Sequence, residues 1–452
     1  MSPSMGVALL VPFTFGMEPA YAFILFVAAY QAANYGGSIT AIAVNTPGTA
    51  SAVVTAIDGY ELTRNGVPGK ALGAAVVSSA AGGLLGTIIL IVCAVPIARF
   101  GLRFGPPEYF ALAFLGLTTV VTLGGSSPLK SLVALSIGLL ASTVGLDPFS
   151  GEPRYTFGEI TLFDGFSFIP AMIGLFALAE ILYQLESNTD QEQNTTSAFS
   201  NVLPSLSQIW GFRTTLARSS LIGTAIGVIP GAGATIASFI SYGQAKRWSK
   251  APEEFGKGSL EGIAASEGAN SSSVGGALVP LLSLGIPGSA TDAVLLGALT
   301  LHGLVAGPEL FSKHPDVVYG IFVCLLLANV LILLFGLLGN RLWLSLINAP
   351  KSLLYTLITL MCILGSFTVS NNISDCWVCL SFGVLGWLLK RHGFQPAPVV
   401  LGLILGEMLE MNFRRSILMG DLQIFLGRPI ALVLLAVALF SVLNTLVPKH
   451  QE

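Results

Sequence analysis

The residues with the clearest chemical potential lie in an apolar stretch, residues 261–303. Beyond Glu261 at its start, this stretch carries two carboxylates, Glu267 and Asp292, and Pro287-Gly288 interrupts it near its middle. An unpaired polar group in hydrocarbon costs several kcal/mol, so such groups persist only inside protein or beside a watery cavity. The mixture therefore predicts a binding site at membrane depth. Its candidate members are Glu267, Asn270, Pro287, Gly288, Ser289, Thr291 and Asp292.

Two other apolar stretches, residues 35–57 and 221–242, are broken in the same way. A helix that starts inside the membrane directs its unpaired N–H groups and positive dipole end at one point, which suits an anion. Unwound carbonyls and hydroxyls nearby suit a cation. We expect the breaks to surround one charged solute near the midplane. The candidate residues are Asn45, Thr46, Pro47, Gly48, Thr49 and Asp58 in the first stretch, and Pro230, Gly231 and Gly233 in the other.

Each candidate also has a simpler structural interpretation. The Pro-Gly pairs could be ordinary helix kinks. Asp292 and Asp58 are candidate cation ligands or proton carriers, because carboxylates in membrane segments are rare and expensive. Asp58 could equally cap a helix end that faces water. Glu267 and Asn270, at i,i+3 spacing on a helix, could line the solute path or lie in a solvated loop. His302 has the setting of a packed histidine rather than a ligand.

The composition predicts an all-α polytopic membrane protein. Of 452 residues, 53% are hydrophobic and 10% are charged, whereas soluble domains carry roughly 25% charged residues. Apolar runs recur near the length that spans a bilayer, which predicts about 11 to 13 membrane elements, some broken or re-entrant. The net charge of -3 and the lack of a basic tract exclude nucleic acid as an expected partner. Cys376 and Cys379 have metal-knuckle spacing, but no second pair accompanies them, so no metal site is expected.

An internal similarity predicts two duplicated, inverted halves. Tyr35-Gly36-Gly37 followed by Asn45–Ser51 can be laid over Val274-Gly275-Gly276 followed by Gly285–Thr291. Duplicated halves with Gly/Pro-interrupted segments in corresponding places are typical of secondary transporters. We predict a first half at 1–186, a polar linker at 187–218 and a second half at 219–452. The first-half partner of Pro230-Gly231 would lie before Met1, so we expect an N-terminally shortened chain.

Several motifs resemble those of the large membrane subunit of the tripartite tricarboxylate transporter family. The resemblance implies a permease of the bacterial inner membrane that works with a small membrane subunit and a periplasmic solute-binding protein. It also implies uptake of a carboxylate such as citrate, driven by a sodium or proton gradient, with no cofactor. The matching motifs are Asn45-Thr46-Pro47-Gly48-Thr49 with Asp58-Gly59-Tyr60, Gly66 with Gly69-Lys70-Ala71-Leu72, Ile229-Pro230-Gly231-Ala232-Gly233, and Gly276 with Leu284-Gly285-Ile286-Pro287-Gly288-Ser289.

Two other classes of function compete with the permease. A membrane-embedded enzyme would need a catalytic cluster at a membrane edge, and the sequence has none with metal-ligand spacing, so we expect no enzyme. An inactive remnant or scaffold is the alternative that the short N-terminus supports. If the permease interpretation holds, helix N-termini, hydroxyls and co-bound cations must hold the substrate carboxylates, because the broken stretches contain no Lys or Arg.

Overall fold

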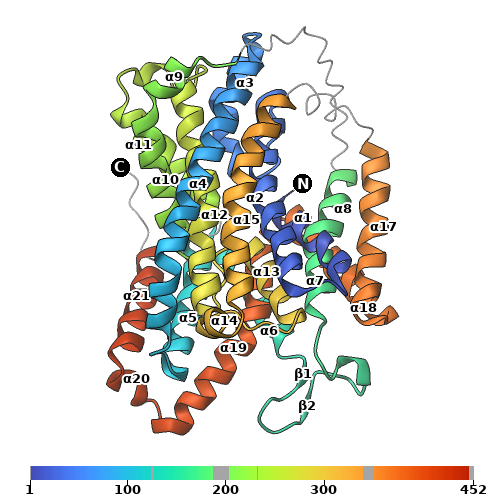
Figure 1. The fold of residues 1–452 in the computed structure, drawn as a ribbon. Helices are drawn as coiled ribbons and strands as arrows, with labels where there is room; N and C mark the ends of the chain where they lie inside the picture. Colours follow the sequence, from blue (N-terminus) through green and yellow to red (C-terminus); the bar gives the residue numbers. More distant parts are fainter. Residues whose placement is uncertain (1, 124–126, 187–202, 232, 340–350, 447–452) are drawn as a thin grey trace.

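The computed structural model describes residues 2–123, 127–186, 203–231, 233–339 and 351–446. These residues form a helical bundle with a single pair of two-residue strands among them (Figure 1). The predicted class, an all-α polytopic membrane protein, is confirmed. Four of the described helical segments are long and apolar enough to cross a membrane: Pro68–Gly101, Phe168–Glu186, Pro315–Leu338 and Ile373–Arg391.

The elements follow the predicted apolar segments closely. Up to residue 186 they are α1 (Pro3–Leu10), η1 (Val11–Thr14), α2 (Pro19–Val44), α3 (Ala52–Arg64), α4 (Pro68–Gly101), α5 (Pro106–Leu123), α6 (Pro128–Ser142), β1 (Gly145–Leu146), β2 (Pro153–Arg154), η2 (Ile160–Leu162), α7 (Phe168–Ile173), the π-helical turn η3 (Gly174–Leu178) and α8 (Ala179–Glu186). Strands β1 and β2 pair antiparallel, with Gly145 opposite Arg154.

After residue 202 the chain continues as a further series of helices. The elements are α9 (Leu206–Gly211), α10 (Arg213–Gly227), α11 (Gly233–Trp248), η4 (Pro252–Glu254), α12 (Leu260–Leu284), α13 (Ala290–Leu301), α14 (Pro308–Lys313), α15 (Pro315–Leu338), α17 (Lys351–Ser370), α18 (Ile373–Arg391), α19 (Ala397–Gly420), α20 (Ile424–Gly427) and α21 (Pro429–Leu446). Many of these helices begin at a proline, whose missing N–H costs nothing in the first turn.

Helix α12 is the centre of the bundle. Every residue from Gly262 to Ser283 is buried, and α12 packs on α4, α10 and α11. Glycines make this packing close. A Cβ on Gly82 of α4 would lie 2.3 Å from the Gly268 carbonyl oxygen, and one on Gly227 of α10 would lie 2.4 Å from that of Ser273. Close approach through small residues is the usual way in which membrane helices associate.

Two predicted boundaries are wrong. The broken stretch predicted at 35–57 does not begin at Tyr35, because α2 runs without interruption from Pro19 to Val44. Gly37 lies within this helix, and the chain that follows the helix packs closely against it. A Cβ on Gly37 would lie 2.5 Å from Thr49 Cγ2. The predicted stretch also does not end at residue 57, because α3 continues to Arg64.

The predicted linker at 187–218 is described only in part. Residues 187–202 lie outside the described residues. From there a capping box at Ser205 and Gln208 starts α9, and α10 begins at Arg213, before the predicted boundary. The division into halves stays a prediction, as does the number of membrane elements.

The two ends of the bundle carry different elements. Helices α3, α9 and α11 gather at one end, and β1, β2, α14 and α20 lie at the other (Figure 1). The loop that contains the strands is fastened to α19 by ion pairs, in which Arg154 contacts Glu410 at 2.9 Å and Arg414 contacts Asp147 at 2.9 Å. Between these ends lie the broken segments.

Candidate binding site at the broken helices

The first break ends α2 and reverses the chain. Asn45 takes a left-handed conformation, with φ 52°, which Asn adopts more easily than most residues. The chain then folds back along α2, so that the Gly48 N–H donates to the Gly37 carbonyl at 3.0 Å. Thr49 Oγ1 accepts the Ala52 N–H at 3.2 Å as α3 begins. The Pro47-Gly48 pair therefore separates two helices and does not merely kink one.

The second break repeats this backbone path. Helix α12 ends at Gly285, with φ 73°, and the chain returns along it until Gly288 lies beside Ala277, where a Cβ on Gly288 would be 3.5 Å from Ala277 Cβ. Ser289 Oγ then accepts the Asp292 N–H at 3.2 Å as α13 begins. In both breaks the glycine lies beside the residue eleven positions before it. This likeness is what a duplication predicts, and the duplication itself stays a prediction.

A third break joins the second one. Helices α10 and α11 form a hairpin whose tip contains Pro230 and Gly231, followed by Gly233 at φ 59°. The Gly231 N–H donates to the Gly288 carbonyl at 2.8 Å. A Cβ on Gly231 would lie 2.7 Å from Val120 Cα of α5. The tip is therefore held between α5 and the second break, so two of the three predicted breaks meet.

Glu267 connects four helices near the first break. Ser38 Oγ of α2 and Thr55 Oγ1 of α3 donate to its Oε1 at 2.6 and 2.5 Å, and Ser79 Oγ of α4 donates to Oε2 at 3.4 Å. Glu267 lies in the middle of α12 and is 0% exposed. The alternative of a solvated loop for Glu267 is therefore wrong. Hydroxyl donors satisfy both oxygens of this carboxylate.

Asp292 lies near the second break in a different environment. It is 0% exposed in the first turn of α13. The hydroxyls of Tyr30 and Ser289 lie beside it, and they are 3.3 Å from each other. Neither carboxylate oxygen of Asp292 has a hydrogen-bond partner among the described residues. Its neighbour Thr291 is also buried, with 6% of its surface exposed.

The two carboxylates are separated along α12. Helices α2 and α12 run antiparallel, because Ser38 contacts Glu267 while Asn34, one turn earlier, accepts the Asn270 Nδ2 hydrogen bond at 3.4 Å. Gly288 returns to the level of Ala277, ten residues from Glu267, which is about 15 Å along a helix. The structure thus forms one polar centre at each break and not a single one.

The other predicted residues have distinct places. Asn45, Thr46 and Pro47 are exposed, whereas Thr49 is buried. Asp58 lies in the middle of α3, where its Oδ1 accepts the N–H groups of Gly256, Gly258 and Ser259 at 2.7 to 2.9 Å. Tyr242 donates to its Oδ2 at 2.8 Å. These are the contacts of a cap at the start of α12, as in the capping alternative, although Asp58 is buried and does not face water.

The sequence interpretation missed the polar partners on α2. Tyr30, Asn34 and Ser38 are spaced four residues apart on this apolar helix. The side chains of Tyr30 and Ser38 contact Ser289 and Glu267, and the backbone carbonyl of Asn34 accepts a hydrogen bond from Asn270. Polar residues at i,i+4 spacing on a membrane helix predict a polar face that packs inside the bundle, so this pattern could have identified them. Thr55 and Ser79 had no comparable signal, because tertiary packing alone brings them to Glu267.

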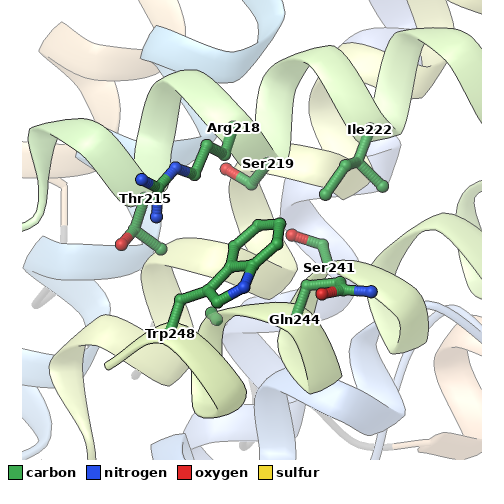
Figure 2. A pocket seen from close by; sticks show the side chains of 8 residues that line it. Thr215, Arg218, Ser219, Ile222, Ser241, Gln244 and Trp248 are labelled. Carbon is green, nitrogen blue, oxygen red and sulfur yellow. The ribbon is translucent and has the colours of Figure 1, made fainter. Parts of the chain in front are cut away.

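A small pocket lies away from both centres, between α10 and α11 (Figure 2). In Figure 2 the Trp248 ring lies between the two helices, near Arg218 and Thr215. The Arg218 guanidinium carbon is 5.0 Å from the ring centroid, a cation–π distance. None of the predicted binding residues lines this pocket, and we assign it no part in the candidate site.

The fold and the buried polar centres define a class: a polytopic helical membrane protein whose helices break around buried carboxylates, an architecture typical of transporters. Residues 1–401 match the tripartite tricarboxylate transporter TctA family. The chain belongs to this family. The resemblance expected from the sequence motifs is thus confirmed.

Two similar proteins come from Agrobacterium vitis. A 52.8 kDa protein of the TAR-I ttuC' 3' region is 38% identical over 451 residues, which cover 99% of this chain and 90% of the relative. A protein of the TAR-II ttuC' 3' region is 36% identical over 229 residues, 50% of this chain and 95% of the relative. No solved structure matches the chain.

Proposed function

We propose that the chain is the large permease subunit of a tripartite uptake system for tricarboxylates or related carboxylates, driven by a sodium or proton gradient in the bacterial inner membrane. Its partners are a small membrane subunit and a periplasmic solute-binding protein that delivers the substrate. Membership of a transporter family supports the general class. The coupling, the partners and the site residues are parts of the proposal.

One observation supports the permease mechanism above the others: the repeated backbone reversal beside a buried carboxylate. At each break one helix ends and another begins inside the bundle, so that backbone N–H groups at the start of α3 and of α13 lie near polar side chains. Helix N-termini attract carboxylates. We assign the substrate to these N-termini and to the hydroxyls of Thr49 and Ser289, with Asn270 between the two centres.

The proposal has to explain how an anion binds near Glu267 and Asp292. A co-bound cation resolves this, because it offsets the charge of a buried carboxylate and leaves the helix N-terminus free to attract the substrate. No Lys or Arg lies in residues 35–57, 221–242 or 261–303 to do the same. This requirement favours cation-coupled uptake over a uniport mechanism.

Reconstitution of all three components tests the proposal. Proteoliposomes that hold both membrane subunits, supplied with the binding protein, are expected to accumulate labelled citrate or a related carboxylate when a sodium or proton gradient is imposed. Vesicles without the large subunit are the control. If the complete system accumulates none of a panel of di- and tricarboxylates under either gradient, the proposed function is wrong.

A further inference from the structure

We propose that Asp292, together with the hydroxyls of Ser289 and Tyr30, is the site that binds a monovalent cation, sodium or a proton. That this cation drives uptake depends on the proposed function, whereas its binding does not. The observation behind the proposal is the state of the Asp292 carboxylate, which is wholly buried and without a hydrogen-bond partner among the described residues.

A buried carboxylate without a hydrogen-bond partner is energetically unfavourable in a membrane core unless a positive charge neutralises it. Burial of an isolated charge costs far more than any single hydrogen bond recovers, so the group either takes up a proton or binds a cation. No Lys or Arg lies in residues 261–303. Glu267 provides the contrast within the same bundle, because hydroxyls of Ser38, Thr55 and Ser79 occupy its oxygens.

The surrounding oxygens suit a small monovalent cation. Ser289 Oγ and Tyr30 Oη are 3.3 Å apart and lie beside Asp292, so two neutral oxygens adjoin one carboxylate. Oxygen ligands of this kind, at a helix break, coordinate sodium or carry protons in secondary transporters. A single carboxylate carries one negative charge, which one monovalent cation neutralises.

The elements packed on α13 supply few other titratable groups. Helix α13 packs on α1, α2, α7, α12 and α19. Tyr30 of α2 is the titratable neighbour of Asp292. Glu267 of α12 is about 15 Å away along that helix, and Glu407 and Glu410 of α19 lie in the part of that helix that is only partly buried. Tyr30, a neutral hydroxyl, does not offset a charge on Asp292, whereas a bound cation would.

This site would also connect separate parts of the bundle. Tyr30 belongs to α2, whereas Ser289 and Asp292 follow the second break. The Gly288 carbonyl, next to Ser289, accepts the N–H of Gly231 at the tip of the α10–α11 hairpin. A cation between Tyr30 and Asp292 would hold α2, the second break and the hairpin tip in one arrangement, so its release would loosen all three.

Cation binding to the purified chain in nanodiscs tests this proposal without the partner proteins. The probes are ²²Na⁺ binding and a difference titration of bound protons between wild type and Asp292→Asn. We expect saturable sodium binding, or one titrating proton, that Asp292→Asn abolishes. Tyr30→Phe, which removes one oxygen ligand, should weaken sodium binding by about tenfold. Asp316→Asn, at an exposed carboxylate outside the candidate site, is the matched control and should retain the cation response.

The outcomes separate this inference from the proposed function. A sodium response identifies sodium as the ligand, and a proton difference without sodium binding identifies the proton. An Asp292→Asn variant that elutes as a folded protein, binds sodium and titrates as wild type does would overturn the cation site. Gradient-driven carboxylate uptake by that variant would show that the cation at Asp292 does not drive uptake, while leaving the permease function intact. Conversely, Asp292-dependent cation binding without carboxylate uptake by the complete system would refute only the function.

Discussion

The two breaks share a backbone path but differ in their surroundings. At the first, Asn45, Thr46 and Pro47 are exposed, and the nearby carboxylate, Glu267, is satisfied by hydroxyls from three helices. At the second, residues 285–288 are buried, and both oxygens of Asp292 lack a partner among the described residues. Similar backbone geometry therefore supports two kinds of polar centre. In one the carboxylate is hydrogen-bonded to side chains of neighbouring helices, and in the other the carboxylate is available to a ligand.

The α10–α11 hairpin accounts for part of this difference. Its Gly231 N–H donates to Gly288, and its tip covers the second break. At the first break, the Gly48 N–H instead donates to the carbonyl of Gly37 in α2, the helix that this break ends. The following predictions test whether the two breaks have separate roles.

The largest effect is expected from bulky residues at the two break glycines. Gly48→Leu and Gly288→Leu should each abolish carboxylate uptake by the reconstituted system, because a Cβ on Gly48 would already lie 2.7 Å from Gly37 Cα and one on Gly288 would lie 3.2 Å from the Gly227 carbonyl oxygen. Membrane insertion, measured by protease protection, should remain. Gly6, around which a Cβ would meet nothing within 4 Å, provides the control Gly6→Leu. Unchanged uptake in both break variants would contradict a role for the breaks.

The two carboxylates should differ in what they contribute to stability. Glu267→Gln should lower the free energy of unfolding by about 2 kcal/mol, because it replaces charge-assisted hydrogen bonds from several helices. Asp292→Asn, which removes an unpaired buried charge, should change it by about 0.5 kcal/mol or less in buffer without sodium. Thermal unfolding of the purified variants in one detergent measures the difference. Equal losses in the two variants would remove the distinction between the centres.

Small substitutions at the break glycines sharpen the comparison. Gly48→Ala should destabilise by about 1 to 2 kcal/mol, because its Cβ meets fixed backbone of α2 at 2.7 Å. Gly288→Ala should cost less than about 1 kcal/mol, since its nearest contacts are at 3.2 to 3.5 Å. Thermal unfolding again gives the measurement. A larger loss for Gly288→Ala would show that the second break is the tighter one.

The smallest effect is a local one in the loop outside the membrane segments. N–H groups of Ser150 and Phe149, with Arg414, lower the pKa of Asp147 from 3.8 to about 2. A lowered pKa means that this carboxylate stabilises the loop fully above about pH 3.8 and loses that contribution as the pH falls through about 2. Hydrogen exchange of residues 145–154, corrected for intrinsic rates, should therefore increase in that range.

Asp147→Asn should show the faster loop exchange already at neutral pH. Exchange at the two breaks, in contrast, should not change with Asp147, because the loop contacts α19 through Glu410 and Arg414 and not the break residues. A coupled change at the breaks would show that the loop and the candidate site communicate.

Much of the fold could be predicted from the sequence, because polar backbone exposed to hydrocarbon is energetically costly. The apolar runs predicted most helices to within a few residues, and the Pro-Gly pairs predicted where helices end inside the bundle. The uninterrupted course of α2 through Gly36-Gly37 could not be predicted from the sequence. The glycine at position 37 makes room for the returning chain at Thr49, and that contact exists only in the folded protein. Local signals cannot report a contact made twelve residues later.

The sequence by itself determined the membrane class, the family resemblance and the positions of the breaks, because composition, length and Pro-Gly placement act locally. Tertiary structure alone decided which carboxylate is satisfied and which is not. Glu267 receives its donors from α2, α3 and α4, whereas neither oxygen of Asp292 has a partner in hydrogen-bonding geometry among the described residues. Hydrogen bonding depends on distances of a few tenths of an ångström between distant segments, and no sequence pattern specifies them.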